Sequence, residues 1–263
     1  IPFITPSATT SDVRRYGSFL FSTALTYSSQ AQRMADYAIG RLGFRRFAVL
    51  YPDAPYGQEL TRHFTQEVGQ RGGEIIAVEA YKPQDTDFGQ QIRRIRDVDL
   101  QRDGMTTSTK TSKGTVRITY APGFDAVFLP GDYSQVALIA PQLVFYDIKV
   151  PLLGSNGWNS PDLLRLADRT LDGGIFVDAF FLDSPDPSIR EFVERYRRRY
   201  QSNPTLFAAQ AYDAARLVLD AVRKGATTGR AVREQLARGE DPAVPGVAAP
   251  FGPNGVLNRH LFV

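Results

Sequence analysis

The histidines and one closely spaced pair of acids are the residues of this chain best suited to acid–base catalysis. His63 falls on a predicted helix and His260 in the C-terminal tail, and neither belongs to a catalytic motif. Asp85 and Asp87 could act as paired carboxylates. They lie at the N-terminal end of the predicted helix that runs through Phe88, however, where acids interact favourably with the helix dipole. We therefore expect helix capping from the two acids and no catalysis from the histidines.

Other catalytic and cofactor motifs are absent from the sequence. The chain has no cysteine, which excludes disulfides, thiolate catalysis and cysteine-based metal sites. It contains no glycine-rich phosphate loop and no G-x-S-x-G nucleophile elbow. His, Asp and Glu do not occur at the spacing of metal ligands. We expect no enzyme activity, no metal and no cofactor, and an enzyme on a doubly wound fold is the weakest alternative.

The charge pattern gives little support for nucleic-acid binding. The 263 residues carry a net charge of +3, and 43% are hydrophobic and 22% charged, which is typical of a globular protein. The densest basic cluster, Arg195–Arg199, lies on a predicted amphipathic helix. It forms either a solvated face or a contact with an anionic surface or partner. No apolar run reaches the roughly 20 residues of a membrane helix. The chain opens like an interior strand, so we expect further residues upstream.

Strands alternate with helices of a length that favours parallel βαβ units. The predicted strands are Ile1–Thr5, Phe19–Thr23, Arg46–Tyr51, Glu74–Tyr81, Asp125–Leu129, Val150–Gly154 and Gly174–Phe181. The predicted helices are one capped by Ser28 or Ser29, then Gly57–Gln70, Thr86–Arg96, Ser134–Tyr146, a short one capped by Ser160, Pro187–Gln201, Leu206–Lys224 and Thr228–Arg238. Pro141 should kink or interrupt its helix, and Asn254–Gly255 predicts a hairpin turn.

Two segments stand out from this alternation. The run FAVLYPDAPYGQEL, from Phe47 to Leu60, predicts a buried strand that leads through a turn into a helix. Ligands of open α/β sheets bind at such strand ends. Residues 98–122 are rich in Thr and Ser and predict a β-hairpin insertion with a mobile tip. This insertion is either a surface excursion or a docking element for a partner protein.

Six segments together carry a resemblance to a known family. They are IPFITPSATT (Ile1–Thr10), YPDAPYGQEL (Tyr51–Leu60), YKPQDTDFGQQI (Tyr81–Ile92), DAVFLPGDYSQVALIAPQL (Asp125–Leu143), VPLLGSNGW (Val150–Trp158) and PTLFAAQAYDAA (Pro204–Ala215). In this order they resemble the type I periplasmic binding proteins, in particular the branched-chain amino-acid (leucine-binding-protein-like) group of ABC transporters. Within that family they also resemble the receptor-type domain of penicillin-binding-protein activators.

The resemblance implies an α/β fold of two doubly wound parallel-sheet lobes joined by a hinge, with the first lobe incomplete at its N-terminus. We assign residues 1–26 and 185–240 to this partial lobe 1. We assign residues 27–184 and 241–263 to lobe 2, which contains the hairpin insertion.

The resemblance also implies positions for a bound ligand. Ser7 and Thr9 match the segment that grips an α-carboxylate through amides and hydroxyls, although the same residues could cap a turn locally. Tyr56 matches an aromatic residue of the opposite lobe, unless it packs at its own turn. Phe207 matches an apolar wall residue, although a helical phenylalanine is more often part of a core.

Three positions bear on the identity of that ligand. Asn156 stands where the family places an acid that pairs with the ligand's ammonium, and a neutral amide cannot replace that charge. Asp132 could supply a negative charge from a new place or could cap the following helix. Trp158, the single tryptophan, is either a stacking wall of the cleft or a packing residue. These departures weaken the expectation of a free branched-chain amino acid.

The family resemblance implies a non-catalytic periplasmic solute-binding receptor that holds an amino-acid-like small molecule between its lobes. The alternative is an activator-type envelope lipoprotein domain that binds a peptidoglycan synthase. Expected partners are the small molecule and either an ABC permease or the synthase, without nucleic acid. The expected location is the periplasm or cell envelope, with a lipid anchor in a region outside this sequence. A sugar-responsive repressor core shares the fold, but the sequence shows no helix-turn-helix.

Overall fold

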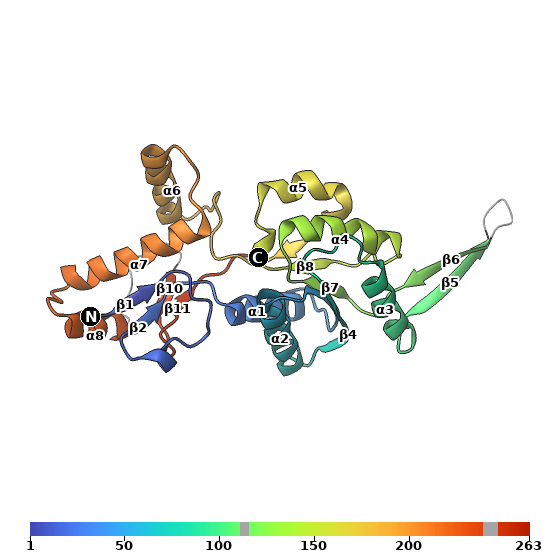
Figure 1. Ribbon diagram of the computed structural model, residues 1–263, viewed down its shortest axis with the longest axis horizontal. Coiled ribbons are helices and arrows are strands. Elements are labelled where there is room, and N and C mark those ends of the chain that lie inside the picture. Colours follow the sequence, from blue (N-terminus) through green and yellow to red (C-terminus); the bar gives the residue numbers. More distant parts are fainter. Residues whose placement is uncertain (111–115, 239–246) are drawn as a thin grey trace. The chain divides into compact units, whose positions relative to one another are not determined.

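The computed structural model describes residues 1–110, 116–238 and 247–263, which form two compact units (Figure 1). The first unit contains 1–29 and 178–262, and the second contains 30–177 and the last residue. Residues 247–262 therefore belong to the first unit, whereas the sequence analysis assigned them to the second lobe. The reason is packing, because Phe251 and Leu257 bury their side chains with Phe21 in a core cluster of the first unit.

The second unit is built on a five-stranded parallel sheet with the order β4-β3-β7-β8-β9. Its strands are β3 (Arg46–Pro52), β4 (Glu74–Tyr81), β7 (Ala126–Leu129), β8 (Leu152–Gly154) and β9 (Ile175–Phe176). The apolar run of β3 is buried on both faces, as expected for a parallel sheet covered by helices. Strand β9 is shorter than predicted, because Asp178 already pairs with the backbone of Phe262 in the first unit.

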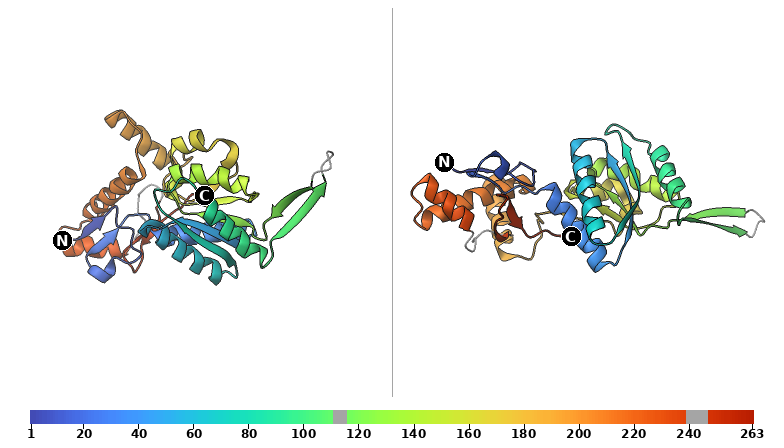
Figure 2. Two further views of the ribbon diagram at one scale, coloured as in Figure 1. Left: turned by 45° about the vertical axis from the view of Figure 1, so that its right-hand side comes forward. Right: turned by 90° about the horizontal axis from the view of Figure 1, so that it is seen from below.

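Helices cover both faces of this sheet (Figure 2). They are α1 (Tyr27–Ala35) with a π-helical continuation (Asp36–Arg41), α2 (Pro55–Gln70), α3 (Gly89–Leu100), α4 (Tyr133–Phe145) and α5 (Pro161–Ala167). Phe64 of α2 packs against Phe47 and Phe128 on one face. The other face buries Leu50 with residues of α3 and α4.

Local hydrogen bonds explain where these helices begin. Thr26, and neither of the predicted serines, caps α1, since its Oγ1 accepts from the amide of Ser29 at 3.2 Å. Helix α3 begins three residues later than predicted. Asp87 Oδ1 accepts from the amide of Gly89 at 2.8 Å, which supports the predicted capping role. Helix α4 runs through Pro141 without interruption.

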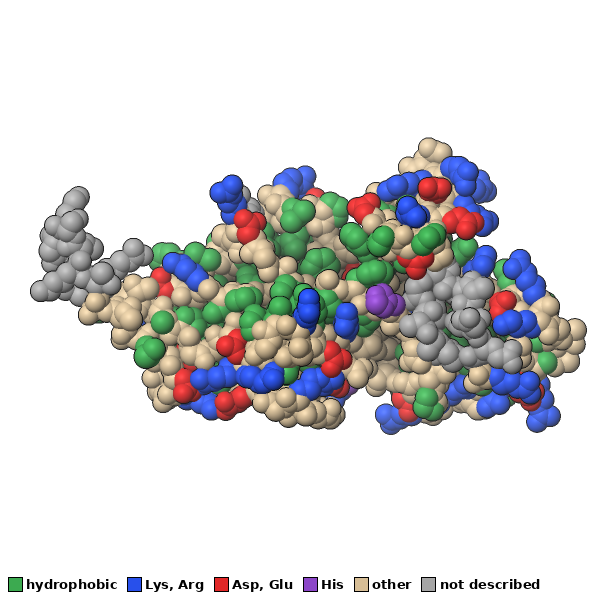
Figure 3. Space-filling model, turned by 180° about the vertical axis from the view of Figure 1, so that it is seen from behind, with side chains coloured by type: hydrophobic (Ala, Val, Ile, Leu, Met, Phe, Trp, Pro, Cys, Tyr) green, Lys and Arg blue, Asp and Glu red, His purple; other side chains and the backbone are tan. Residues whose placement is uncertain are grey.

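In its described residues, the first unit contains two small sheets and three α-helices. Strands β1 (Phe3–Thr5) and β2 (Leu20–Ser22) are parallel, and β10 (Val247–Phe251) and β11 (Leu257–Arg259) are antiparallel. The predicted Asn254–Gly255 turn joins the latter pair, with φ of 76° at Gly255. The helices are α6 (Pro187–Tyr200), α7 (Leu206–Arg223) and α8 (Gly229–Arg238). Arginines of the predicted basic cluster are exposed on α6, where Lys and Arg side chains gather in Figure 3.

The insertion forms the predicted antiparallel hairpin of β5 (Met105–Lys110) and β6 (Val116–Ala121). It extends away from the rest of the second unit in Figures 1 and 2. The predicted mobile tip lies outside the described residues. In the part of the chain that the structure describes, no helix is long and apolar enough to cross a membrane.

Candidate functional site

The topology of the second unit singles out one place on its sheet for ligand binding. From β3 the chain moves outward to β4 and then returns to form β7 on the other side of β3. The order of strands thus reverses between β3 and β7, and such switch points form crevices at the carboxyl ends of the strands. The segments after β3, β7 and β8 meet here closely, because a Cβ on Gly157 would lie 2.6 Å from the carbonyl oxygen of Gly131.

Tyr56 is the centre of a hydrogen-bond network at this edge. Its hydroxyl lies 2.8 Å from Ser155 Oγ and donates to Asn156 Oδ1 at 3.2 Å. It also accepts from the amide of Gly157 at 3.3 Å. Gln30 Oε1 accepts from the amide of Asn156 at 3.0 Å, which fixes the same loop from α1. The structure therefore brings together two of the predicted ligand residues, Tyr56 and Asn156, through direct side-chain contact.

Two other predicted ligand residues of this unit have structural partners. Asp132 caps α4, since its Oδ1 accepts from the amide and the hydroxyl of Ser134 at 3.0 and 2.8 Å. Trp158 is buried, and its Nε1 donates to the carbonyl of Leu129 at 3.0 Å. A Cβ on Gly154 would lie 2.3 Å from the indole ring. Of the alternatives left open by the sequence, the geometry favours capping for Asp132 and packing for Trp158.

The remaining predicted ligand residues, Ser7, Thr9 and Phe207, lie in the first unit. Ser7 is exposed in the segment after β1, where Thr5 Oγ1 accepts from the amides of Ser7 and Ala8 at 3.3 and 3.1 Å. Thr9 is half-buried. Phe207 lies in the first turn of α7 with 66% of its surface exposed, so it is not a core residue. Their approach to Tyr56 and Asn156 stays a prediction.

Buried polar side chains form hydrogen bonds with the backbone of the 5–9 segment, and the sequence analysis did not predict this role. Gln210, with its amide oriented to suit its neighbours, donates to the carbonyl of Pro6 at 2.6 Å and accepts from the amide of Leu25 at 2.8 Å. Ser22 Oγ donates to the carbonyl of Ala8 at 3.1 Å. Thr23 Oγ1 donates to the carbonyl of Gln210 at 2.9 Å. A signal was present in the motif AAQAYDAA, where polar residues interrupt the apolar face of a helix.

A buried ion pair lies one turn after Gln210 on α7. Asp213 Oδ2 lies 2.6 Å from Arg259 Nη2, and both side chains are 5% exposed. Arg259 Nε also donates to the carbonyl of Thr23 at 2.9 Å. Burial raises the pKa of the Asp213 carboxyl, while Arg259 opposes this shift. The pair ties β11 and β2 to α7 and so supports the 5–9 segment.

The titratable groups of the second unit do not form a catalytic arrangement among the described residues. Burial raises the pKa of Tyr81, whose hydroxyl donates to Gln135 Oε1 at 3.2 Å. Burial lowers the pKa of His63 on α2, as does the neighbouring Arg62. Over the described ranges, no group of three His, Cys, Asp or Glu residues could hold a metal ion.

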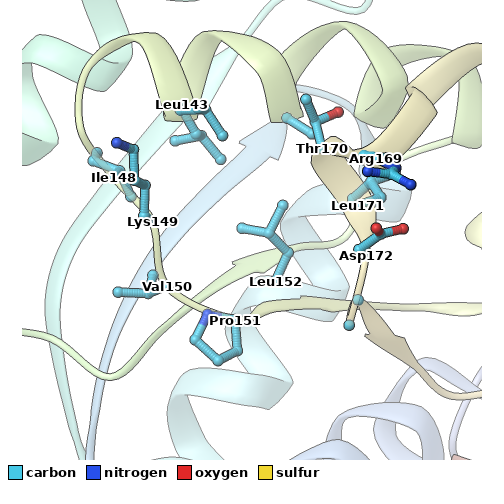
Figure 4. Close-up of a pocket in the computed structure, with 14 residues that line it drawn as sticks. Leu143, Ile148, Lys149, Val150, Pro151, Leu152, Arg169, Thr170, Leu171 and Asp172 are labelled. Carbon is cyan, nitrogen blue, oxygen red and sulfur yellow. The ribbon is translucent and has the colours of Figure 1, made fainter.

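A pocket of about 510 Å³ lies at the amino-terminal ends of the strands, where β8 and β9 begin (Figure 4). Leu143, Ile148 and Leu152 give it an apolar floor, and Lys149 and Arg169 lie at its rim. None of the predicted ligand residues lines it. The pocket is therefore distinct from the Tyr56 network.

Comparisons with known proteins cover the whole chain. A family model described as "Periplasmic binding protein" matches residues 1–263. Leu/Ile/Val-binding protein homolog 3 of Brucella melitensis biotype 1 is 19% identical over 226 residues, or 86% of this chain and 54% of the relative. The chain thus spans about half the length of this curated relative.

Solved structures are similar over almost the full chain. A protein of Rhodospirillum rubrum, named as a candidate branched-chain amino acid ABC transporter, matches with a TM-score of 0.83 and 25% identity, over 99% of this chain and 69% of that one. The substrate-binding protein LivJ of Streptococcus pneumoniae, solved with isoleucine, matches with a TM-score of 0.67 and 26% identity, over 99% and 68% of the two chains. The α/β fold predicted from the sequence is confirmed.

Proposed function

This chain belongs to the periplasmic binding protein family, and we propose that it is a solute-binding receptor domain that holds a small amino-acid-like molecule without transforming it. The observation that carries the proposal is the Tyr56 network at the switch point of the parallel sheet. Hydroxyl, amide and backbone groups converge there, as in sites that bind polar small molecules. The titratable residues of the second unit form no catalytic arrangement within the described ranges, which supports a binding role.

We assign direct ligand contacts to Tyr56 and Asn156 in the second unit and to Ser7 and Thr9 in the first. Asp132 and Trp158 support the site from their capping and packing positions. Phe207 is an exposed apolar residue available for a ligand wall. An ABC permease is the partner that this role implies, and the cell envelope is the location. A lipid anchor belongs to the same proposal.

Asn156 distinguishes between classes of ligand. Its amide carries no charge, so a ligand ammonium would lack a carboxylate at this position. We therefore favour a carboxylate-bearing ligand whose amino group is absent, substituted or neutralised elsewhere. Asn156→Asp adds the missing negative charge and should shift preference toward free amino acids.

Ligand-dependent thermal stabilisation tests the proposed role. The purified protein is heated with leucine, isoleucine, valine and a series of aliphatic and aromatic carboxylates. A ligand at 100 times its Kd should stabilise the folded state by about 2.7 kcal/mol and raise Tm. Tyr56→Phe should reduce that shift, whereas Tyr200→Phe, at an exposed position on α6, should leave it unchanged. A panel without any shift would argue against the receptor role.

A second candidate function is an activator-type domain that binds a peptidoglycan synthase. The observation that favours it is the β5–β6 hairpin, which no part of the ligand network requires. Co-purification with a synthase in the absence of any small ligand would support this role. A ligand-dependent complex with a permease would support the receptor role instead.

A further inference from the structure

The pocket where β8 and β9 begin has a rigid apolar floor (Figure 4). Leu143, Ile148 and Leu152 form this floor, and each side chain is at most 7% exposed. All three belong to the core cluster of the second unit, so packing fixes their positions. The pocket volume of about 510 Å³ falls within the range of small-molecule sites, which is about 300–1,000 Å³.

Two glycines leave one wall of this pocket without side chains. Gly173 and Gly174 line the pocket between a short 3₁₀ helix (Asp168–Leu171) and β9. Gly173 has a φ of 80°, which favours glycine, and a Cβ built there would meet nothing within 4 Å. The turn therefore contributes backbone to the lining and leaves the space beside it open to a ligand.

Two cations stand at the rim of the apolar floor. Figure 4 shows Lys149 and Arg169 on opposite sides of the pocket, with Leu152 between them. Lys149 Nζ lies 3.7 Å from Asp147 Oδ1, which is longer than a hydrogen bond. Arg169 forms no ion pair with any carboxylate whose side chain the structure describes. Asp172 also lines the pocket, so the charged lining residues are two cations and one carboxylate, with a net positive charge.

This combination selects an aliphatic chain that carries one anionic group. The guanidinium group of Arg169 presents paired N–H donors that match the two oxygens of a carboxylate. The apolar floor favours a hydrocarbon chain, and each buried methylene should strengthen binding about fourfold. A cationic chain would face the net positive charge of the lining. A short anion such as acetate would leave the floor exposed to water.

We propose that this pocket is a second binding site, which takes an aliphatic carboxylate of medium chain length. The carboxylate pairs with Arg169, and the chain lies on the floor formed by Leu143, Ile148 and Leu152. Lys149 attracts the anion from the other side of the pocket and contributes less. This inference does not rest on the proposed ligand site, because no predicted ligand residue lines the pocket.

Titration of the purified protein with matched small molecules tests the proposal. Octanoate is the probe, acetate has the same charge without the chain, and octylammonium has the same chain with the opposite charge. Isothermal titration calorimetry should detect binding of octanoate alone among these three. Affinity should rise about fourfold for each methylene added from hexanoate to octanoate. In NMR spectra, octanoate should shift the methyl resonances of Ile148, Val150 and Leu152, which line the pocket.

Two substitutions in the pocket should each weaken octanoate binding by at least about tenfold. Arg169→Glu replaces the cation that pairs with the carboxylate by an anion that repels it. Val150→Trp fills the pocket with an indole ring. Thermal unfolding shows whether each variant is folded. Arg169 is exposed, so its variant keeps the proposal testable if Val150→Trp does not fold.

Matched controls make the same changes outside the pocket. Arg62→Glu reverses an exposed cation on α2, and Leu164→Trp enlarges an 82% exposed apolar residue on α5. Both variants should bind octanoate as the unaltered protein does.

Several results would overturn the proposal. They are the absence of octanoate binding, equal binding of octylammonium, and full octanoate affinity in Arg169→Glu. Binding that is lost in Tyr56→Phe and retained in Arg169→Glu would place octanoate at the Tyr56 network instead. Conversely, octanoate binding that survives Tyr56→Phe but not Arg169→Glu supports the pocket, even if leucine, isoleucine and valine give no thermal shift.

Discussion

The two units of the chain bury their interiors by different means. The second unit covers a five-stranded parallel sheet with helices, and one large apolar cluster includes Leu50, Ile92 and Leu129. In its described residues, the first unit has only two-stranded sheets and smaller apolar clusters. It adds a buried polar network around Gln210 and the ion pair of Asp213. Apolar burial is non-directional, whereas a polar network positions particular backbone groups.

This difference matches the way in which each unit is expected to position its residues of the proposed ligand site. In the second unit, the topology of the sheet alone brings three strand ends together at the Tyr56 network. In the first unit, side chains must hold the 5–9 segment, because β1 and β2 form a sheet of only two strands. Substitutions in the two interiors should therefore have distinguishable effects.

The largest effect should come from the apolar interior of the second unit. Phe128 is buried in β7 and stacks on Phe64 with 4.1 Å between ring centroids. Phe128→Ala should cost about 3–5 kcal/mol of stability through lost burial and a cavity. Phe251→Ala, in the smaller cluster of the first unit, should cost less. Urea unfolding of the two variants measures the comparison, and equal losses would contradict it.

The ion pair of the first unit should give the next largest effect. Asp213→Ala leaves the Arg259 guanidinium buried without its carboxylate and should cost about 3 kcal/mol. Asp213→Leu combined with Arg259→Met removes both charges and should recover much of this loss. Thermal unfolding of the single and double variants provides the measurement. A double variant as unstable as Asp213→Ala would show that the charges do not drive the effect.

The Tyr56 network should have a smaller, local effect. Tyr56→Phe keeps the ring but removes the hydroxyl that contacts Ser155, Asn156 and Gly157. We expect a loss of about 1–2 kcal/mol of stability. Hydrogen exchange should show faster exchange of the Gly157 amide. Unchanged protection there would mean that the loop is held by other contacts, such as that of Gln30.

The smallest effect should be a pH dependence from His63. Burial, and then Arg62, lower its pKa in the folded protein below the ordinary value of 6.5. A depressed pKa favours the neutral ring, so its contribution to stability is present above pH 6.5. This contribution is lost as pH falls through 6.5 toward the folded pKa. His63→Gln should flatten the fall in Tm between about pH 7 and 5. A variant that retains the full slope would assign the dependence to other groups.

Local patterns were sufficient to predict most elements but not the cap of α1, the continuity of α4 or the end of β9. Thr26 was overlooked as the cap of α1 because the following serines offered the same chemistry. Helix α4 was predicted to kink or be interrupted at Pro141; it is not interrupted, and its apolar residues Ile139, Ala140 and Leu143 pack in the core on both sides of this proline. The end of β9 depends on where the chain enters the first unit, which no local signal records.

The sequence by itself determined the alternation of strands and helices, the hairpin insertion, the family and the absence of cysteine chemistry. These depend on residue types and on short-range spacing. The tertiary structure alone decided that Trp158 packs in the core of the second unit, that Phe207 is exposed and that Gln210 and Asp213 support the 5–9 segment. It also decided that residues 247–262 belong with the first unit. The physical reason is that these outcomes depend on contacts between residues far apart in the chain, which local propensity and periodicity do not encode.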